Sequence, residues 1–317
     1  MNGRDDINNM TIVKFFSGKE TRALAEKIAL AYDNPLGAIT SQKFSDGEIH
    51  ISYDESIRGC EVFLIQSTTP PADNVFELLL MIDAARRASA KYVTVVVPYF
   101  GYARQDRKDK ARVSIAAKLI ANLLSASGAD RLMTMDLHAG QIQGFFDIPV
   151  DHLDASAIFV PYLKAQNLDN IVFAAPDVGG SARARVYAKF FNAEIAICDK
   201  QRKRANEVAS MQVIGDVDGR NVVLVDDMID TAGTICKAAE LIKAKGANSV
   251  RAVCAHGILS GKAHEMITAS VLEEVVISDS IPQKKENDKI KILSVASLFA
   301  KAVRRVHSHE SISELFI

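Results

Sequence analysis

One segment of this chain, VVLVDDMIDTAGT, from Val222 to Thr234, concentrates three acidic side chains and two threonines. An apolar run typical of a buried strand ends at Asp226 and Asp227, and the next turn opens a predicted helix. Small residues there let backbone N–H groups approach an anion, and a helix start favours negative charge. Neighbouring carboxylates make sense if the ligand also carries hydroxyl groups or Mg²⁺, as a sugar phosphate does. The segment predicts a sugar-phosphate site, although an acidic helix cap uses the same residue types.

Other segments that follow apolar runs also carry groups suited to phosphate chemistry. Arg104 can pair with a nucleotide phosphate, and the Gln105 amide can serve a base or ribose. His138 lies among acidic residues, which suits a divalent cation, and Asp177 in the loop PDVGG is a second candidate metal ligand. Four cations between positions 200 and 204 would repel one another unless solvated or neutralised by an anion. Each segment also has a plainer interpretation as solvated charge or polar surface.

The pentapeptide FSDGE, residues 44–48, has the composition of a small base-binding loop. Phe44 offers an aromatic face on which a base can stack, and Asp46 and Glu48 can accept hydrogen bonds from an exocyclic amine. Gly47 permits a tight turn between the two acids. An ordinary acidic turn would contain the same residues.

These segments are joined by a regular alternation of predicted strands and helices, which indicates an α/β fold with mainly parallel sheets flanked by helices. The 317 residues predict two tandem domains, 1–155 and 156–317, with no low-complexity linker between them. Ligands of such sheets bind beyond the carboxyl ends of the strands. The predicted strands are Thr11–Phe16, Glu61–Gln66, Tyr92–Val97, Leu132–Met135, Ile171–Ala175, Glu194–Cys198, Asn221–Val225, Val250–Ala255, Glu274–Ile277 and Ile290–Leu293, and predicted helices include Glu20–Tyr32, Val75–Ser89, Ser114–Ser127, Ser181–Phe191 and Gly233–Ala244.

Charge and composition exclude several classes of protein. The 38 basic and 39 acidic residues give a net charge of −1, which argues against an extended basic surface for nucleic acid or membrane. The sequence has no apolar run long enough to span a bilayer, and MNGRDDINNM does not resemble a secretory signal. The 4 cysteines form no CxxC pair, so we expect buried, reduced thiols and a cytoplasmic location.

Several of these segments, in the same order, resemble the ribose-phosphate pyrophosphokinase family, whose domains have the type I phosphoribosyltransferase fold. The 222–234 segment alone also fits the phosphoribosyltransferases, but a plain phosphoribosyltransferase needs one such domain and no FSDGE loop. The resemblance covers nearly the whole chain from about Met10. It is carried by FSDGE, YARQD, TMDLHA, GQIQGFFDIPVDHL, APDVGG, DKQR, the 222–234 segment, HGILSG, VVISDSIP and SISELF.

The resemblance implies a ribose-phosphate diphosphokinase that transfers the β,γ-diphosphoryl group of ATP to the 1-hydroxyl of ribose 5-phosphate, releases AMP and feeds nucleotide biosynthesis. It implies Mg²⁺ as cofactor and a homo-oligomer, a hexamer, with allosteric control and with the FSDGE loop contributed to a neighbouring subunit. The implied residues are Lys200 and Arg202 for catalysis; Phe44, Asp46, Gly47, Glu48, Arg104, Gln105 and His138 for ATP; Arg202, Asp226, Asp227, Asp230, Thr231, Ala232, Gly233 and Thr234 for ribose 5-phosphate; and His138 and Asp177 for the metal.

The sequence departs from the family pattern at Ser114, Gln201 and Lys203, where the family usually has Pro, Arg and Pro. Two alternatives remain, a phosphoribosyltransferase and a non-catalytic regulatory homologue, although the second would be expected to disrupt the basic loop or the metal positions. The resemblance also implies that the C-terminal tail packs back on the first domain. Residues 1–9 precede the family's usual start, and a disordered arm is expected there.

Overall fold

The computed structural model describes residues 11–201 and 210–315, and the chain divides into two compact units. Unit 1 runs to His152 and also contains Phe299–Ile312, whereas unit 2 contains Leu153–Leu298 and the chain from Ser313 on. A first domain limited to residues 1–155 therefore leaves out the returning C-terminal segment of unit 1. Each unit has a mainly parallel sheet flanked by helices, which confirms the predicted fold class.

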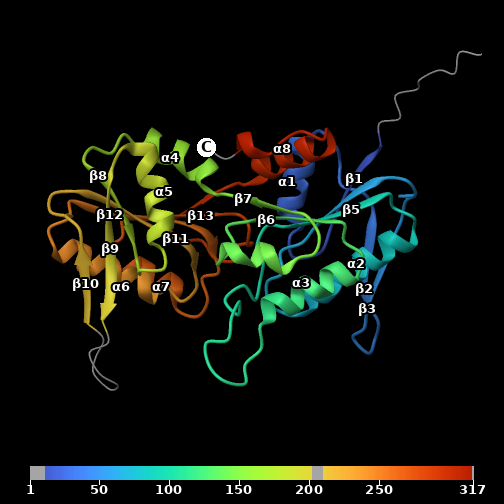
Figure 1. Ribbon diagram of the computed structural model, residues 1–317, viewed down its shortest axis with the longest axis horizontal. Coiled ribbons are helices and arrows are strands. Elements are labelled where there is room, and N and C mark those ends of the chain that lie inside the picture. The colour runs from blue at the N-terminus through green and yellow to red at the C-terminus, as the bar shows by residue number, and fades with distance from the viewer. Residues whose placement is uncertain (1–10, 202–209, 316–317) are drawn as a thin grey trace, which may run out of the picture. The chain divides into compact units, whose positions relative to one another are not determined.

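The sheet of unit 1 has the strand order β1-β4-β5-β6-β7, and β1, β4, β5 and β6 are parallel to their neighbours. Helices α2 and α3 lie on one face of this sheet and α1 and α8 on the other (Figure 1). The central strands are buried because both faces are covered. The elements are β1 (Val13–Ser17), α1 (Arg22–Tyr32), β2 (Ile39–Lys43), β3 (Ile49–Tyr53), β4 (Glu61–Ile65), α2 (Asp73–Arg87), β5 (Tyr92–Val97), α3 (Ala116–Ala126), β6 (Arg131–Met135), the 3-10 helix η1 (Gly140–Phe145), β7 (Val150–Leu153) and α8 (Ala296–His307).

The sheet of unit 2 has the order β10-β9-β8-β11-β12-β13-β14, in which β9 and β10 are antiparallel and the other neighbours parallel. Helices α4 and α5 lie on one face and α6 and α7 on the other (Figure 1). The elements are α4 (Ser156–Ala165), β8 (Ile171–Ala175), α5 (Ser181–Phe191), β9 (Glu194–Gln201), β10 (Ser210–Ile214), β11 (Asn221–Ile229), α6 (Gly233–Ala244), β12 (Ser249–Gly257), α7 (Ala263–Ala269), β13 (Glu274–Ser278), β14 (Ile290–Leu293) and the 3-10 helix η2 (Ser313–Leu315).

All ten strands expected from apolar runs are present, with small shifts at their ends. Strands β2, β3, β7 and β10 were not predicted from the sequence. Strands β2 and β3 read ITSQK and IHISY and form a separate antiparallel hairpin whose residues are half-buried or exposed. Their mixed polarity follows from this exposure, because no second layer covers both faces.

Helix α8 is attached to unit 1 by its basic side chains. The Arg304 guanidinium donates hydrogen bonds to the carbonyl oxygens of Ala31 and Tyr32, at 3.2 and 2.8 Å, and lies 4.7 Å from the centre of the Tyr32 ring. Nδ1 of His307 lies 2.6 Å from Oε2 of Glu61 at the start of β4. Arg304 therefore satisfies carbonyl groups that the end of α1 leaves without helical partners.

The β2–β3 hairpin is tied to the sheet through Glu77 of α2, whose side chain is buried. Its Oε1 accepts a hydrogen bond from Ser41 Oγ on β2, at 2.5 Å. Its Oε2 accepts hydrogen bonds from the backbone N–H of Lys19 and from Nε2 of Gln66, at 3.1 and 2.9 Å. One buried carboxylate thus joins the hairpin to the ends of β1 and β4.

No helix within residues 11–201 and 210–315 is long and apolar enough to cross a membrane. The four cysteines, Cys60, Cys198, Cys236 and Cys254, are buried and none is in a disulfide, as the sequence predicts.

We predict that Glu77→Ala lowers the free energy of unfolding by about 3 kcal/mol, because it leaves buried donors without acceptors. Urea denaturation of the variant and the wild type measures this change. Glu26→Ala is the matched control, because Glu26 forms only an exposed ion pair with Arg22 and its loss should leave the unfolding midpoint unchanged. Equal midpoints for Glu77→Ala and Glu26→Ala would contradict the prediction.

Candidate functional site

The strand order of unit 2 reverses between β8 and β11. From β8 the chain moves outward to β9, then returns to the other side of β8 to form β11 and continues to β12. Parallel strands end at the same edge, and ligands of open α/β sheets bind at such a reversal. Asp177 lies in the loop after β8, whereas Asp226 and Asp227 lie in the last part of β11 itself and residues 230–234 connect its end to the start of α6, so both predicted groups lie at this edge.

Residues 230–234, which connect the end of β11 to the start of α6, form an open turn of backbone that we call the cradle. Ala232, which is buried, has the left-handed φ of 63°, and α6 begins at Gly233 without a hydrogen bond from a capping side chain. The first helical backbone bond runs from the Cys236 N–H to the Ala232 carbonyl. The N–H groups at the start of a helix have no intrahelical acceptor, and together with the helix dipole they favour a bound anion.

The space beside Gly233 in the cradle is not filled by other residues of the described structure. A Cβ built on Gly233 would meet nothing nearer than Thr231 Oγ1, at 3.8 Å. Because a methyl group would fit there, the packing of the described residues does not require glycine. The absence of a side chain instead leaves the peptide groups open to a ligand, and the hydroxyls of Thr231 and Thr234 are exposed beside them.

Two adjacent carboxylates and one arginine determine the electrostatics of the cradle. Arg183 Nη1 on α5 lies 3.1 Å from Asp227 Oδ1 and 3.9 Å from Asp226 Oδ1, and the Asp227 N–H donates to Asp226 Oδ1 at 2.9 Å. Burial and the neighbouring Asp227 charge raise the pKa of Asp226 to about 8, although Arg183 acts in the opposite direction. The Asp226 carboxyl therefore keeps its proton to higher pH than an ordinary aspartate does.

Asp177 lies in the loop between β8 and α5, and its side chain is exposed. Its Oδ1 accepts a hydrogen bond from the Gly180 N–H at 3.0 Å, and α5 begins at the next residue. No group of three His, Cys, Asp or Glu side chains able to hold a metal occurs in the described ranges. Mg²⁺ commonly uses one or two carboxylates and completes its shell with phosphate oxygens and water, so the exposed Asp177 carboxylate fits such an ion.

In unit 1 the FSDGE segment forms the turn of the β2–β3 hairpin. Gly47 has the left-handed φ of 98°, the Phe44 N–H donates to the Glu48 carbonyl, and Asp46 Oδ1 accepts from the Glu48 N–H. The Phe44 side chain is 51% exposed, and its ring centre lies 5.5 Å from that of His50. The Phe44 ring and the residues Asp46 and Glu48 are therefore accessible at the turn of the hairpin.

Arg104 and Gln105 lie in the loop between β5 and α3, and both are exposed. The backbone of Gln105 is fixed, because its N–H donates to the Tyr102 carbonyl and its carbonyl accepts from the Ala117 N–H. The Gln105 side chain accepts a hydrogen bond from Ser114 Oγ at 3.2 Å. Ser114, one of the departures from the family pattern, therefore contacts a predicted ATP-binding residue.

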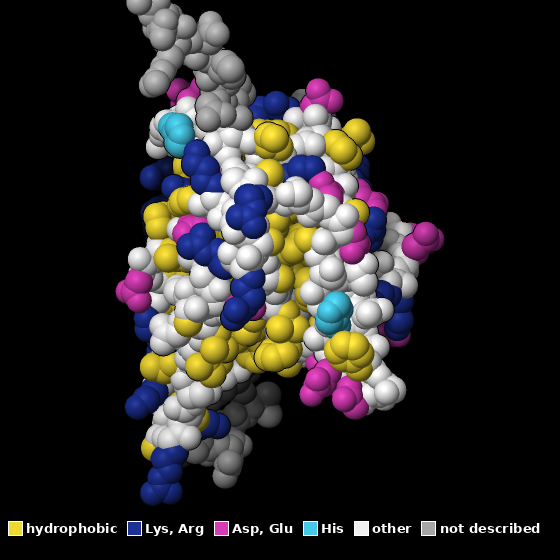
Figure 2. All heavy atoms as spheres, turned by 90° about the vertical axis from the view of Figure 1, so that its right-hand side faces the viewer, with side chains coloured by type: hydrophobic (Ala, Val, Ile, Leu, Met, Phe, Trp, Pro, Cys, Tyr) yellow, Lys and Arg dark blue, Asp and Glu magenta, His cyan; other side chains and the backbone are white. Residues whose placement is uncertain are grey.

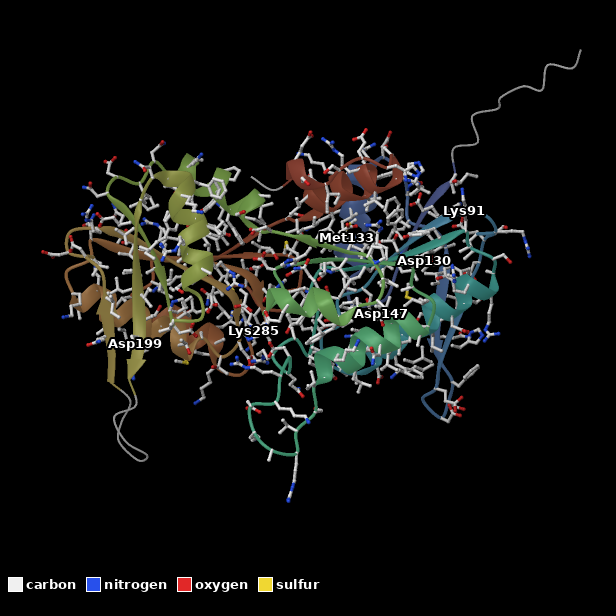
Figure 3. All side chains as sticks on the ribbon, viewed as in Figure 1. Lys91, Asp130, Met133, Asp147, Asp199 and Lys285 are labelled. Carbon is white, nitrogen blue, oxygen red and sulfur yellow. The ribbon has the colours of Figure 1, made fainter. Side chains whose placement is uncertain are left out.

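His138 is exposed in the segment that follows β6. Of the acids near it in sequence, Asp151 is committed elsewhere, because both its oxygens lie 2.9 Å from Arg131 Nη1 and its side chain is buried. Asp147 lies after η1 (Figure 3). His138 is therefore accessible to a ligand, whereas the Asp151 carboxylate is engaged in a buried ion pair with Arg131.

Of the predicted catalytic pair, Lys200 and Arg202, the structure describes the backbone of Lys200 alone. Lys200 lies on β9, where its backbone pairs with that of Met211 on β10, and Asp199 precedes it (Figure 3). Arg202 and Lys203 lie outside the described residues, as do residues 1–9. Arg183 was not among the residues predicted from the sequence, where its signal is a cation near the start of the predicted helix that follows PDVGG.

Two family models match the chain. Residues 13–128 match the N-terminal domain of ribose phosphate pyrophosphokinase, and residues 198–317 match the phosphoribosyl synthetase-associated domain. Ribose-phosphate pyrophosphokinase from Porphyromonas gingivalis is 57% identical over 98% of this chain and 99% of its own length. The chain belongs to the ribose-phosphate pyrophosphokinase family.

Other members of this family are also similar over almost their full length. The ribose-phosphate pyrophosphokinase from Campylobacter jejuni is 53% identical over 96% of this chain and 99% of its own. The crystal structure of phosphoribosylpyrophosphate synthetase from Mycobacterium smegmatis covers 94% of this chain and 100% of its own, with 38% identity and a TM-score of 0.89. This ribose-phosphate pyrophosphokinase family member is therefore a transferase of the kinase type, as the sequence predicts.

The raised pKa of Asp226 predicts how stability depends on pH. An aspartate with a raised folded-state pKa holds its proton in the folded protein over a range where the unfolded chain has released it. The contribution of Asp226 to stability then falls as the pH rises from about 4 towards 8. We predict that Asp226→Asn reduces this loss, as measured by unfolding midpoints at pH 5 and pH 8. Asp288→Asn, at an exposed loop position, controls for the lost carboxylate, and a wild-type pH dependence in Asp226→Asn would contradict the prediction.

Proposed function

We propose that the protein transfers the diphosphoryl group of ATP to the 1-hydroxyl of ribose 5-phosphate, giving 5-phosphoribosyl 1-pyrophosphate and AMP, and that it feeds nucleotide biosynthesis. The observation that carries this proposal is the uncapped start of α6 next to the carboxylates of Asp226 and Asp227. An anion cradle beside hydroxyl-accepting oxygens matches a phosphorylated sugar better than phosphate alone.

In this proposal the 5-phosphate accepts hydrogen bonds from the backbone of residues 230–234 and from the Thr231 and Thr234 hydroxyls. Asp226 and Asp227 accept hydrogen bonds from the ribose hydroxyls, and Arg183 keeps Asp227 in place from α5. Held at both ends, the sugar presents its 1-hydroxyl in one orientation. Alignment of this kind supplies a large part of the rate in phosphoryl-transfer enzymes.

During transfer, the 1-oxygen of the sugar forms a bond to the β-phosphorus of ATP while the bond from that phosphorus to the α,β-bridging oxygen breaks. The bonding pair leaves with AMP, and the 1-hydroxyl proton passes to solvent. Lys200 and Arg202 stabilise the negative charge that develops on the transferred group. His138 and Asp177 would each serve as a ligand in the Mg²⁺ sites, and the bound metal would supply positive charge that neutralises the phosphate oxygens.

At the nucleotide end, we propose that Phe44 stacks on adenine and that Asp46 and Glu48 accept from its exocyclic amine, with Gly47 setting the turn. Arg104 pairs with a phosphate and Gln105 serves the base or ribose. The exposure of all these side chains supports a role in binding rather than in packing.

We also propose that the protein acts in the cytoplasm as an allosterically controlled hexamer, in which the hairpin turn serves a neighbouring subunit. Large hydrophobic side chains are exposed on unit 1, where Phe76 on α2 and Leu119 and Leu123 on α3 are 56%, 57% and 38% exposed. Figure 2 shows a band of hydrophobic side chains over the face of unit 1 that is turned towards the viewer. Contiguous apolar surface of this kind supports subunit association.

We predict that purified protein with ATP and Mg²⁺ releases AMP only when ribose 5-phosphate is added. Lys200→Ala should lower kcat by 10²- to 10³-fold, because a positioned cation that stabilises transition-state charge is lost. Quantifying AMP and phosphoribosyl pyrophosphate by chromatography tests both expectations. Lys189→Ala is the control, because Lys189 is an exposed lysine on α5. AMP release without the sugar, or none from folded wild type with added phosphate, would overturn the proposal.

Gly233→Ala tests the anion cradle without damaging the fold. The added methyl group has space in the protein itself, and alanine favours a helix, so the melting temperature should stay the same or rise. We predict that the KM for ribose 5-phosphate rises at least about tenfold, since the methyl group occupies space close to the bound phosphate. An unchanged KM for the sugar would show that no anion approaches Gly233.

A further inference from the structure

The loop between β12 and α7 lies against the anion cradle and is bonded to it along three consecutive residues. The N–H groups of Ile258 and Leu259 both donate to the Ile229 carbonyl at the end of β11, at 2.9 and 3.0 Å. The Ser260 N–H donates to the Asp230 carbonyl at 2.9 Å, and Ser260 Oγ donates to Asp230 Oδ1. These bonds hold Ile229, the last residue of β11, and Asp230, the first residue of the cradle.

Both sides of this junction contain a non-glycine residue in the left-handed region of the backbone. Leu259 has a φ of 50° and Ala232 a φ of 63°. Such conformations are costly for residues with a Cβ and persist where the surroundings hold them. Leu259 is held by its bond to Ile229 and by burial of its side chain, and it orients Ser260 towards Asp230.

The Ser260 hydroxyl contributes an interaction separate from the fold of its own loop. The backbone of Ser260 serves the local structure, because its carbonyl accepts from the Ala263 N–H at the start of α7. The Ser260 side chain is exposed, and its hydroxyl donates a hydrogen bond to Asp230 of the cradle. Replacing the hydroxyl with hydrogen therefore leaves every backbone bond of the loop intact.

We propose that Ser260 is a positioning residue for the sugar phosphate: its hydroxyl fixes the Asp230 carboxylate and so sets the turn from which residues 231–234 meet the ligand. This inference rests on the proposed function, because it assumes that the cradle binds ribose 5-phosphate. Ser260 acts through Asp230 and does not touch the ligand. The hydrogen bond to a carboxylate is of the stronger kind, so its loss should be measurable in binding.

The test is a steady-state comparison of the wild type with Ser260→Ala, Ser260→Thr and Ser127→Ala, using AMP release with each substrate varied in turn. Ser260→Ala should raise the KM for ribose 5-phosphate about tenfold and leave the KM for ATP within twofold of wild type. Ser260→Thr keeps the hydroxyl and should recover most of the loss. Ser127→Ala removes a hydroxyl at the end of α3 in unit 1, where it donates to the Leu123 carbonyl at 2.8 Å, and should change neither KM.

Several results would overturn the inference. These are an unchanged KM for the sugar in Ser260→Ala, a parallel rise in both KM values, a fall in melting temperature that accounts for the loss, or a Ser260→Thr variant no better than Ser260→Ala. Wild-type protein that forms no AMP with ribose 5-phosphate would instead overturn the proposed function. The two failures are distinguishable because the first requires an active wild type.

Discussion

Two neighbouring carboxylates at the end of a buried strand repel each other, and much of the edge of the unit 2 sheet serves to hold them there. Arg183 reaches Asp227 at 3.1 Å from α5, and the backbone of Asp227 donates to Asp226. The position of α5, and hence of the loop that carries Asp177, is coupled to the charge of the pair through this contact. On the other side, the loop after β12 fixes the next turn through Asp230. Arg183 on α5 therefore offsets the unfavourable electrostatics of the carboxylate pair, while the loop after β12 holds the turn that follows it.

The sheets of the two units differ in strand order, because β1-β4-β5-β6-β7 continues in one direction whereas the order of unit 2 reverses between β8 and β11. After β4 and β5 in unit 1, the protein's own polar groups are paired: Glu77 and Gln66 bond one another, and Thr68 Oγ1 accepts from the Gly101 N–H. A Cβ on Gly101 would lie 2.0 Å from the Thr68 carbonyl, so this glycine is required for packing. Gly233 in unit 2 is not required for packing, because a Cβ there would lie 3.8 Å from its nearest neighbour, Thr231 Oγ1. Mainly parallel sheets therefore carry a closely packed glycine loop at Gly101 in unit 1 and an open glycine cradle at Gly233 in unit 2.

The sequence predicted the central strands and the cradle because both are local patterns. VVLV followed by two acids and a run of small residues identifies β11 and the start of α6 without reference to any other segment. Arg183 was missed because its partner Asp227 is 44 residues away, and charge pairing across loops leaves no periodic signal. The hairpin was missed because its short strands are half-exposed and mixed in polarity. Periodicity also gives no sign that α8 belongs with unit 1, since its bonds to Ala31 and Glu61 join residues more than 240 positions apart.

The attachment of α8 to unit 1 affects how the protein folds while it is being synthesised on the ribosome. Most of unit 1 is translated first, but the helix that covers α1 comes from the far end of the chain. While unit 2 is still emerging from the ribosome, the end of α1 and the apolar surface beneath α8 have no cover. Domains usually complete their folding in the order of synthesis, and nascent chains with exposed apolar surface are those that chaperones retain. In this protein the final packing step of unit 1 must wait until unit 2 and then α8 have been synthesised, so unit 1 cannot complete its folding as an independent N-terminal domain.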